Sequence, residues 1–253
     1  MFFLLGETIL STCEQLGNFG LFSLRVFWTF CRQGCNLKFV LFQMANIGVD
    51  SRWVVILTGA VVGAILAMHG HHALEQYGAY QFLGELVYLS MAREFGCIIS
   101  AIMVIARAGS AMTAEIGSMN ISEQIDALTT LSIDPIRYVV VPRVIASTII
   151  MPFLSLFCIL AGVTAGYVMS VWTLEVNAEL YVDSIRTNIE MGDITKGLLK
   201  AAIFGLLYSL ICTYKGMHAH GGARGIGIAT TESVVSSCVA IFVADYILSA
   251  ILF

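Results

Sequence analysis

A few charged residues lie within long apolar stretches of this 253-residue chain, where charge is unexpected. Arg93 and Glu94 lie about halfway along the apolar stretch Phe82–Ala106, and Asp245 lies within the last apolar stretch of the chain. Glu85 precedes Arg93 by two helical turns and is on nearly the same helical face. A charge in hydrocarbon costs roughly 2.5–3.5 kcal/mol on insertion scales unless it faces a partner or a wet cavity. These four residues are therefore the first candidates for a functional site.

Two kinds of role are open for these charges. They can line a polar path through the membrane, or they can form ion pairs between helices, such as Arg93 with Asp245 or Glu94 with Lys200. Arg93 and Glu94 cannot easily pair with each other, because adjacent residues on a helix point about 100° apart. Glu85 lies near the end of its stretch, so it either lines an exit path or reaches to the membrane interface.

The residue types that could bind a metal ion or a nucleotide do not occur at the spacing that such sites require. His69 and His72 are three residues apart, but without a third ligand they predict interfacial hydrogen bonds rather than a metal site. The seven cysteines include no CxxC pair and are predicted to be small buried apolar side chains. No GxxxxGK[ST] run occurs, so the chain has no P-loop for nucleotide phosphates. We therefore expect no metal, no cofactor and no enzymatic reaction in this chain.

The composition sets the class of protein. Hydrophobic residues make up 58% of the chain and charged residues 12%, against about 25% charged in an average soluble domain. A soluble globular domain and a disordered chain are both excluded by this balance. With 13 Lys and Arg against 17 Asp and Glu, the net charge of -4 offers no basic surface for nucleic acid. At about 20 apolar residues per span, the chain is predicted to be an all-α membrane protein with five spans.

The order of apolar and polar segments divides the chain. Residues 1–50 carry a charged or amide side chain every few positions, which is typical of helices that lie in the membrane interface. The predicted membrane spans are residues 53–74, 82–106, 144–174, 194–214 and 232–253. The predicted connecting segments are a polar segment at 107–143, an acidic loop at 175–193 and a glycine-rich loop at 215–231.

Small residues at four-residue spacing occur in two of these spans. Gly59 and Gly63 form one GxxxG motif, and Gly162 and Gly166 form another. Such motifs allow two helices to approach closely in lipid. The sequence leaves open whether they pack helices within one chain or between two copies of it.

Basic residues predict the orientation, because they concentrate on the cytoplasmic side of membrane proteins. With the N-terminus in the cytoplasm, nine of the 13 basic residues fall inside, three fall outside, and Arg93 lies within the membrane. The three outer ones are Arg186, Lys196 and Lys200. We therefore predict a cytoplasmic N-terminus, a cytoplasmic segment at 107–143 and an outer C-terminus, which is periplasmic in a Gram-negative cell.

The polar segment 107–143 is predicted to contain an amphipathic helix. Its apolar face would consist of Ile121, Ile125, Leu128 and Leu131, and its polar side of Glu123, Gln124 and Asp126. Ser122 is placed to cap this helix and Pro135 to stop it. Such a helix between two spans either docks a soluble partner or covers the membrane surface, and the residues alone favour neither.

Two long runs of the sequence resemble a known family. They are REFGCIISAIMVIARAGSAMTAEIGSMNISEQIDALTTLSIDPIRYVVVPRVIA and GGARGIGIATTESVVSSCVAIFVADYILSAILF. The first is similar to the signature of the MlaE/YrbE-type ABC permeases, the membrane subunits of MCE-linked lipid transporters, and the second to their C-terminal pattern. The resemblance covers roughly residues 20–253. The sequence departs from it at Cys97, where proline is common, and at Ser132, where glycine is common.

The resemblance implies one exporter-like permease domain that acts as a homodimer in a bacterial inner membrane. Each dimer would bind two copies of a cytoplasmic ABC ATPase, which would hold the ATP and Mg, and a periplasmic hexamer of MCE-domain subunits. A STAS-domain protein often accompanies the ATPase, and phospholipid would be the cargo. The implied lipid-cavity residues are Arg93, Glu94, Glu85 and Asp245. The implied ATPase-coupling residues are Glu115, Ile121, Glu123, Ile125, Asp126 and Leu128.

Two other classes of protein are compatible with the residues. An ion-coupled secondary transporter or a channel would use Arg93, Glu94 and Asp245 as an ion relay. It is disfavoured by the five spans, because no inverted repeat is visible in them. A membrane anchor that does not transport would recruit soluble partners through residues 107–143 and would tolerate neutral residues at Arg93 and Glu94.

Overall fold

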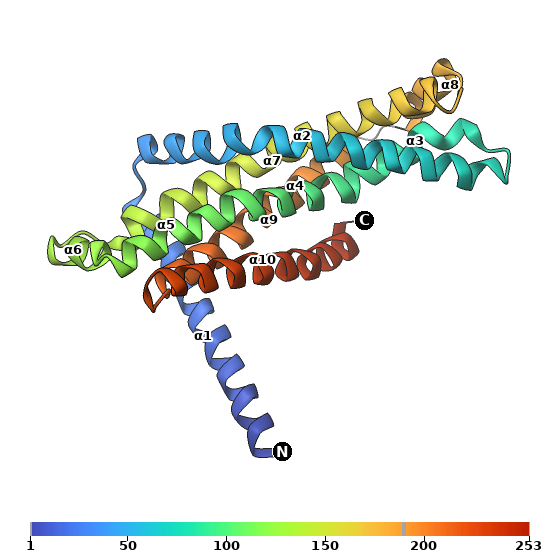
Figure 1. Ribbon diagram of the computed structural model, residues 1–253. Helices are drawn as coiled ribbons and strands as arrows, with labels where there is room; N and C mark the ends of the chain where they lie inside the picture. Colours follow the sequence, from blue (N-terminus) through green and yellow to red (C-terminus); the bar gives the residue numbers. More distant parts are fainter. Residues whose placement is uncertain (1, 189–190, 253) are drawn as a thin grey trace.

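The computed structural model describes residues 2–188 and 191–252, and all regular structure in this part of the chain is helical. Five helical runs in it are long and apolar enough to cross a membrane, which confirms the predicted all-α class. They are Leu37–Glu75, Tyr80–Ile121, Ile136–Trp172, Gly192–Met217 and Gly222–Leu252. Figure 1 shows these runs side by side in an elongated bundle, from which the N-terminal helix diverges.

The bundle is built from ten α-helices and four shorter helical segments in the described residues. In chain order these are α1 (Phe2–Gln33), α2 (Leu37–Glu75), η1 (Tyr80–Phe82), α3 (Leu83–Ser90), η2 (Met91–Phe95), α4 (Gly96–Val104), η3 (Ile105–Gly109), α5 (Ser110–Ile121), α6 (Gln124–Thr130), η4 (Ile136–Val140), α7 (Val141–Trp172), α8 (Ala178–Asn188), α9 (Met191–Met217) and α10 (Gly222–Leu252). The segments η2, η3 and η4 are π-helical, so each adds about one residue to a turn of a longer helix.

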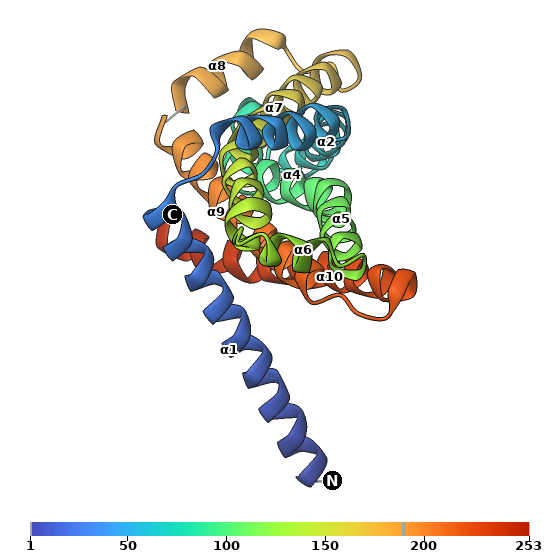
Figure 2. The same ribbon diagram turned by 90° about the vertical axis from the view of Figure 1, so that its left-hand side faces the viewer.

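The first helix stands apart from the bundle, as Figure 2 shows. Its later turns make the contact, because Val26 is buried and the rings of Phe19 and Phe22 meet Tyr214 of α9 edge-on, with centroids 5.5 and 5.4 Å apart. The chain then turns at Gly34, whose φ of +63° suits glycine. Such a largely separate helix is compatible with the interfacial position predicted for residues 1–50, which stays a prediction.

Several helices begin or end outside the predicted spans. Residues 37–50 were predicted to belong to the interfacial part, but they are the first turns of α2, which Asn36 caps by accepting a hydrogen bond from the Lys38 amide at 3.1 Å. Residues 222–231 were predicted to be a loop, but α10 already begins at Gly222. The turn itself is short, with positive φ at Gly221 and Gly222. Apolarity alone therefore underestimates the lengths of these helices, because their polar ends extend beyond the apolar stretches.

Glycines allow a close contact between α2 and α7. A Cβ atom at Gly59 would lie 2.7 Å from the carbonyl oxygen of Cys158, and one at Gly63 would overlap the backbone of Gly162. The two GxxxG motifs therefore meet each other within one chain, which answers the question that the sequence left open.

The predicted amphipathic helix of residues 121–131 is broken into two parts. Ile121 ends α5, and Glu123 has a left-handed φ of 59°, so that α6 spans only Gln124–Thr130. Ser122 does not cap α6, because its hydroxyl donates to the Ser118 carbonyl at 2.7 Å. The helix also ends before Pro135, and Leu131 is 69% exposed. Ile125 is buried and Leu128 packs partly against the core, so the predicted apolar face is correct only for these two.

Ser132 also has a left-handed backbone conformation, with a φ of 59°. It is one of the two positions at which the sequence departs from the family pattern, which commonly has glycine there. We expect Ser132→Gly to stabilise the protein by up to about 1 kcal/mol, because glycine adopts this backbone conformation without steric cost. The thermal unfolding midpoint of the protein in detergent should rise by about 2–4 °C. The control is Ser122→Gly, since Ser122 has a φ of -87° and should gain nothing. An equal or larger gain from the control would contradict this explanation.

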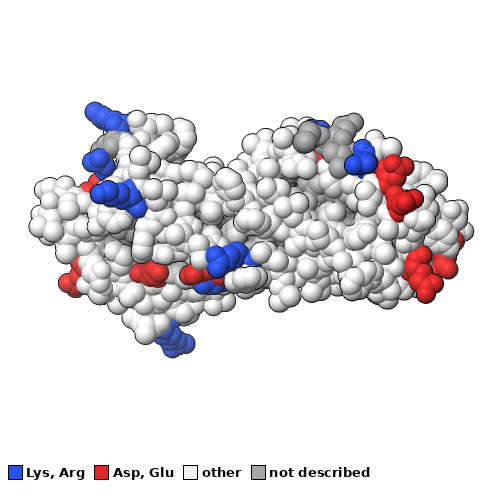
Figure 3. Space-filling view, turned by 90° about the horizontal axis from the view of Figure 1, so that it is seen from above, with Lys and Arg blue, Asp and Glu red and all other residues white. Residues whose placement is uncertain are grey.

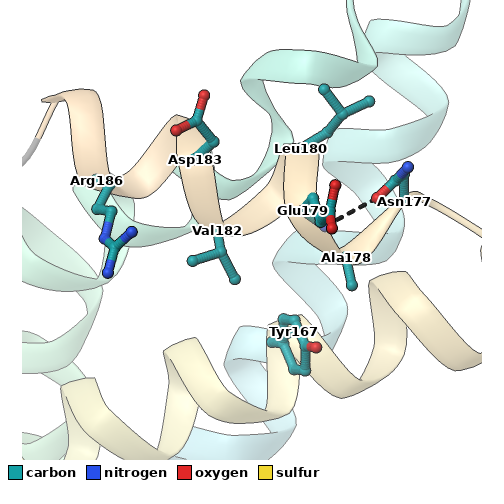
Figure 4. A pocket seen from close by; sticks show the side chains of 8 residues that line it. All are labelled: Tyr167, Asn177, Ala178, Glu179, Leu180, Val182, Asp183 and Arg186. Atoms are coloured by element: carbon teal, nitrogen blue, oxygen red, sulfur yellow. Dashed lines mark hydrogen bonds between the residues drawn. The ribbon is translucent and has the colours of Figure 1, made fainter.

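The end opposite α6 is formed by α8 and the connection from α2 to α3 (Figure 1). Tyr181 fastens α8 to the bundle, because it is 1% exposed and its ring lies 5.6 Å from that of Tyr167 in α7. Burial raises the pKa of Tyr181, so its hydroxyl stays neutral. In Figure 4 α8 runs over Tyr167 along an open pocket of about 710 Å³, with the Asn177 side chain accepting from the Glu179 amide at 2.8 Å.

On the face that Figure 3 shows, many charged side chains lie toward the two ends of the elongated molecule and a few lie near its middle, with uncharged areas between them. This distribution suits a protein whose middle lies in hydrocarbon. The charges that do lie between the ends therefore need partners within the protein.

Candidate functional site

The segment η2 places Arg93 and Glu94 at a contact with α9. The extra residue of its π-helical turn changes the direction of the following side chains, and such turns occur frequently at functional sites. Gly197 of α9 allows this approach, because a Cβ there would overlap the carbonyl oxygen of Ala92. The helical run continues to Ile121, so Arg93 lies nearer its α3 end than the halfway position expected from the sequence.

Arg93 forms a bidentate ion pair with Asp193, which lies in the first turn of α9. Its Nε and one terminal nitrogen donate to the two carboxylate oxygens, both at 3.0 Å. The Asp193 side chain is only 3% exposed, whereas that of Arg93 is 39% exposed. The suggested pairing of Arg93 with Asp245 is therefore wrong. The sequence pointed to a loop for Asp193 because the apolar run starts after it, and no spacing signal linked it to Arg93.

Lys200 of α9 is the centre of the second half of the site. Its ammonium group lies 2.8 Å from a Glu94 carboxylate oxygen and 2.6 Å from one of Asp245 in α10. It also donates to the Arg93 carbonyl at 3.1 Å and to the Ser249 hydroxyl at 2.9 Å. The suggested pairing of Glu94 with Lys200 is confirmed, and Asp245 joins it as a second anion.

Ser249 of α10 links this helix to Glu94 of η2. Its hydroxyl donates to Glu94 Oε1 at 2.9 Å and lies 2.8 Å from the Asp245 carbonyl, one turn earlier in α10. Nothing in the sequence singled out Ser249, because a serine in an apolar helix carries no distinctive signal. We call the set Arg93, Glu94, Asp193, Lys200, Asp245 and Ser249 the intramembrane charge cluster.

Charge and exposure divide this cluster into an inner and an outer part. Three carboxylates face two cations, so the cluster carries one formal negative charge in excess. Lys200 is fully buried and the Asp245 side chain is 14% exposed, while that of Glu94 is 36% exposed. Arg93 and Glu94 are therefore the members that a ligand can reach, and the buried members hold them in place.

The remaining predicted site residues lie elsewhere. Glu85 is half-buried in the first turn of α3, eight residues before Arg93. Glu115 lies in α5 and pairs with the buried Arg143 at 3.1 Å. Glu123 and Asp126 are exposed at the start of α6, at the opposite end of the bundle from α8 (Figure 1). The structure thus separates the predicted coupling residues from the intramembrane charge cluster, and their roles stay predictions.

No group of three His, Cys, Asp or Glu side chains that could hold a metal ion occurs in residues 2–188 and 191–252. A ring nitrogen of His72 lies 2.9 Å from the Met68 carbonyl oxygen, one turn earlier in α2.

Five apolar helical runs with a paired charge cluster among them are the features of a multi-pass helical membrane protein. A family model described as Permease MlaE matches residues 40–251, and the chain belongs to this family. A Rickettsia felis protein named "Probable ABC transporter permease protein" is 37% identical over 98% of this chain and 96% of its own length. The chain is therefore the permease component of an ABC transporter system.

Two other relatives carry names that mention a transport process or a lipid. The "Intermembrane phospholipid transport system permease protein MlaE" of Haemophilus influenzae is 35% identical over 83% of this chain and 81% of its own length. The chloroplastic protein TRIGALACTOSYLDIACYLGLYCEROL 1 of Arabidopsis thaliana is 36% identical over 83% of this chain and 60% of its own length. Similarity to this chain therefore extends from bacteria to a plant organelle.

Proposed function

We propose that this chain is the permease subunit of an ATP-driven transporter that moves phospholipid between the inner and outer membranes of a bacterium. The observation that carries the proposal is the intramembrane charge cluster, in which Arg93 and Glu94 are partly exposed although their partners are buried. A phospholipid carries a phosphate that a guanidinium binds well, and its passage needs polar groups within the hydrocarbon. The name of the Haemophilus relative supports the choice of cargo.

The proposed assembly is a homodimer in the inner membrane with a cytoplasmic N-terminus and a periplasmic C-terminus. A separate ABC ATPase would bind ATP and Mg and would contact the exposed α6 region, where Glu123 and Asp126 lie. An MCE-domain hexamer would dock on the α8 side, and a STAS-domain protein would accompany the ATPase. In this assembly ATP binding moves the α6 region and thereby changes access to the charge cluster.

Neutralising the pair of Arg93 and Asp193 together is expected to reduce phospholipid transport about tenfold or more. In the double variant Arg93→Gln/Asp193→Asn, asparagine keeps the shape of Asp193, glutamine keeps a polar amide at position 93, and no charge at 193 is left without its partner, so the protein should fold. The variant removes a charge-assisted hydrogen bond to the lipid phosphate, which contributes about 1.5–3 kcal/mol. The measurement is ATP-dependent lipid transfer between donor and acceptor vesicles by the purified complex.

The matched control is Lys215→Gln/Glu232→Gln, which neutralises another close ion pair, at 2.8 Å between α9 and α10. The control should transport like the unchanged protein. Equal transport by the two double variants would contradict the assignment of Arg93. A tagged chain that copurifies with no ATPase when expressed with its neighbouring genes would refute the ABC assembly. Transport driven by an ion gradient without ATP would instead establish the ion-coupled alternative.

A further inference from the structure

A second polar pocket, of about 310 Å³, lies between α2 and the η3–α5 region, away from the charge cluster. Its polar lining consists of Gln43, Asn46 and Asp50 from α2 and of Arg107 and Glu115 from the other wall. Its apolar lining includes the buried Ile47 and Met112. The pocket therefore has polar groups of both charge signs over an apolar base.

The position of this pocket along α2 places it at the depth of lipid headgroups. Asp50 precedes Glu75, the last residue of α2, by about 25 residues, which is about 37 Å along the axis at 1.5 Å per residue. The hydrocarbon core of a bilayer is only about 30 Å thick. With Glu75 at one interface, Asp50 lies at the other. Asp50 and the pocket belong to the N-terminal part of α2, which lies toward α6 in Figure 1.

The charged groups of the pocket are paired but remain accessible. An Arg107 nitrogen lies 3.1 Å from an Asp50 oxygen, with the two side chains 42% and 56% exposed. The other Arg107 terminal nitrogen donates to the Ser51 hydroxyl at 3.4 Å. Glu115 pairs with Arg143 at 3.1 Å but is 62% exposed. A ligand can therefore reach one guanidinium and two carboxylates without displacing a buried group.

Two amide side chains supply free hydrogen-bonding capacity. Within residues 2–188 and 191–252, no described hydrogen bond involves the side chains of Gln43 or Asn46. Each amide offers two donor hydrogens and an acceptor oxygen. A headgroup that contains both a phosphate and an ammonium can use all of these groups, with the phosphate toward Arg107 and the amides and the ammonium toward Asp50 and Glu115.

We propose that this pocket binds the zwitterionic headgroup of a phospholipid in the leaflet on the α6 side. The proposal rests on the proposed lipid-transport function and adds to it a headgroup class and a point of entry. Anionic lipids fit less well, because two carboxylates and a single guanidinium line the pocket. Ile47 and Met112 form the apolar base of the pocket, beneath the polar groups.

The test is equilibrium lipid binding to the purified complex that contains the full chain, without ATP, measured by native mass spectrometry. The variant Gln43→Ala/Asn46→Ala should bind phosphatidylethanolamine about 100-fold more weakly or worse, because two hydrogen bonds to charged groups of the lipid are lost. It should fold normally, since neither amide has a partner to lose. The control is Gln81→Ala, which removes an exposed amide in η1 at the other end of the bundle and should leave binding unchanged.

Three outcomes would overturn the proposal. The first is equal phosphatidylethanolamine affinity of the double variant and the Gln81→Ala control. The second is binding of phosphatidylglycerol as tight as that of phosphatidylethanolamine. The third is displacement of the lipid by an equal concentration of glycerophosphoethanolamine, which would make a soluble headgroup the ligand. Because the binding test uses no ATP, none of these outcomes contradicts the proposed transport function. Loss of the ATPase from the purified complex would contradict that function and not the headgroup pocket.

Discussion

Replacing Lys200 with methionine is expected to destabilise the protein by about 3–5 kcal/mol, which is the usual cost of removing one partner from a buried ion pair. Lys200 is fully buried and is the cation between Glu94 and Asp245, at 2.8 and 2.6 Å. Without it, two carboxylates face each other between helices with no countercharge. The expected observations are a lower thermal unfolding midpoint in detergent and a smaller yield of folded protein.

The same site provides a control that separates charge from shape. The triple variant Lys200→Met/Glu94→Gln/Asp245→Asn removes all three charges and keeps side chains of similar volume. It should recover most of the lost stability, because the loss arises from uncompensated carboxylates rather than from missing contacts. If the triple variant is as unstable as Lys200→Met alone, charge balance is not what holds this part of the cluster together.

The second large effect is expected at Gly63, where α2 and α7 are in backbone contact. A methyl group there would overlap the backbone of Gly162, which cannot rotate away as a side chain can. We therefore expect Gly63→Ala to cost about 3 kcal/mol, the upper end of the usual range for overpacking. The measurement is the unfolding midpoint of the purified chain in detergent, together with its folded yield.

Gly227 in α10 provides the comparison for this substitution. A Cβ atom there meets nothing within 4 Å. Gly227→Ala should therefore stabilise the protein by about 0.5–1 kcal/mol, as alanine does in a helix interior. The two substitutions should thus have opposite signs. Similar effects at both positions would mean that helix propensity, and not the contact of α2 with α7, decides the result.

The sequence predicted the helical runs well but their ends poorly. Long apolar stretches mark the membrane spans because lipid excludes charge, and the structure has a helix at each of them. The bounds shifted where polar residues continue a helix, as in the first turns of α2 and α10. At Glu123 the reverse occurred, since a left-handed residue interrupts a periodic pattern. Periodicity does not report such backbone angles.

The candidate site was predicted in part. Arg93, Glu94 and Asp245 were identified because a charge in an apolar stretch is costly and so needs a reason. Asp193 was missed, because it lies 100 residues from Arg93 and at the edge of its apolar stretch. Gln43 and Asn46 were missed as well, since isolated amides near a helix end are common.

By itself, the sequence determined that this protein is a multi-pass helical membrane protein with a few costly charges, and its long motifs pointed to the family. These conclusions depend on composition and local pattern, which lipid constrains strongly. Only the tertiary structure decided that Lys200 holds both Glu94 and Asp245, that Asp193 holds Arg93, and that α2 and α7 meet at their glycines. The physical reason is that ion pairs and close backbone contacts join residues far apart in the chain, and their partners follow from how the helices pack.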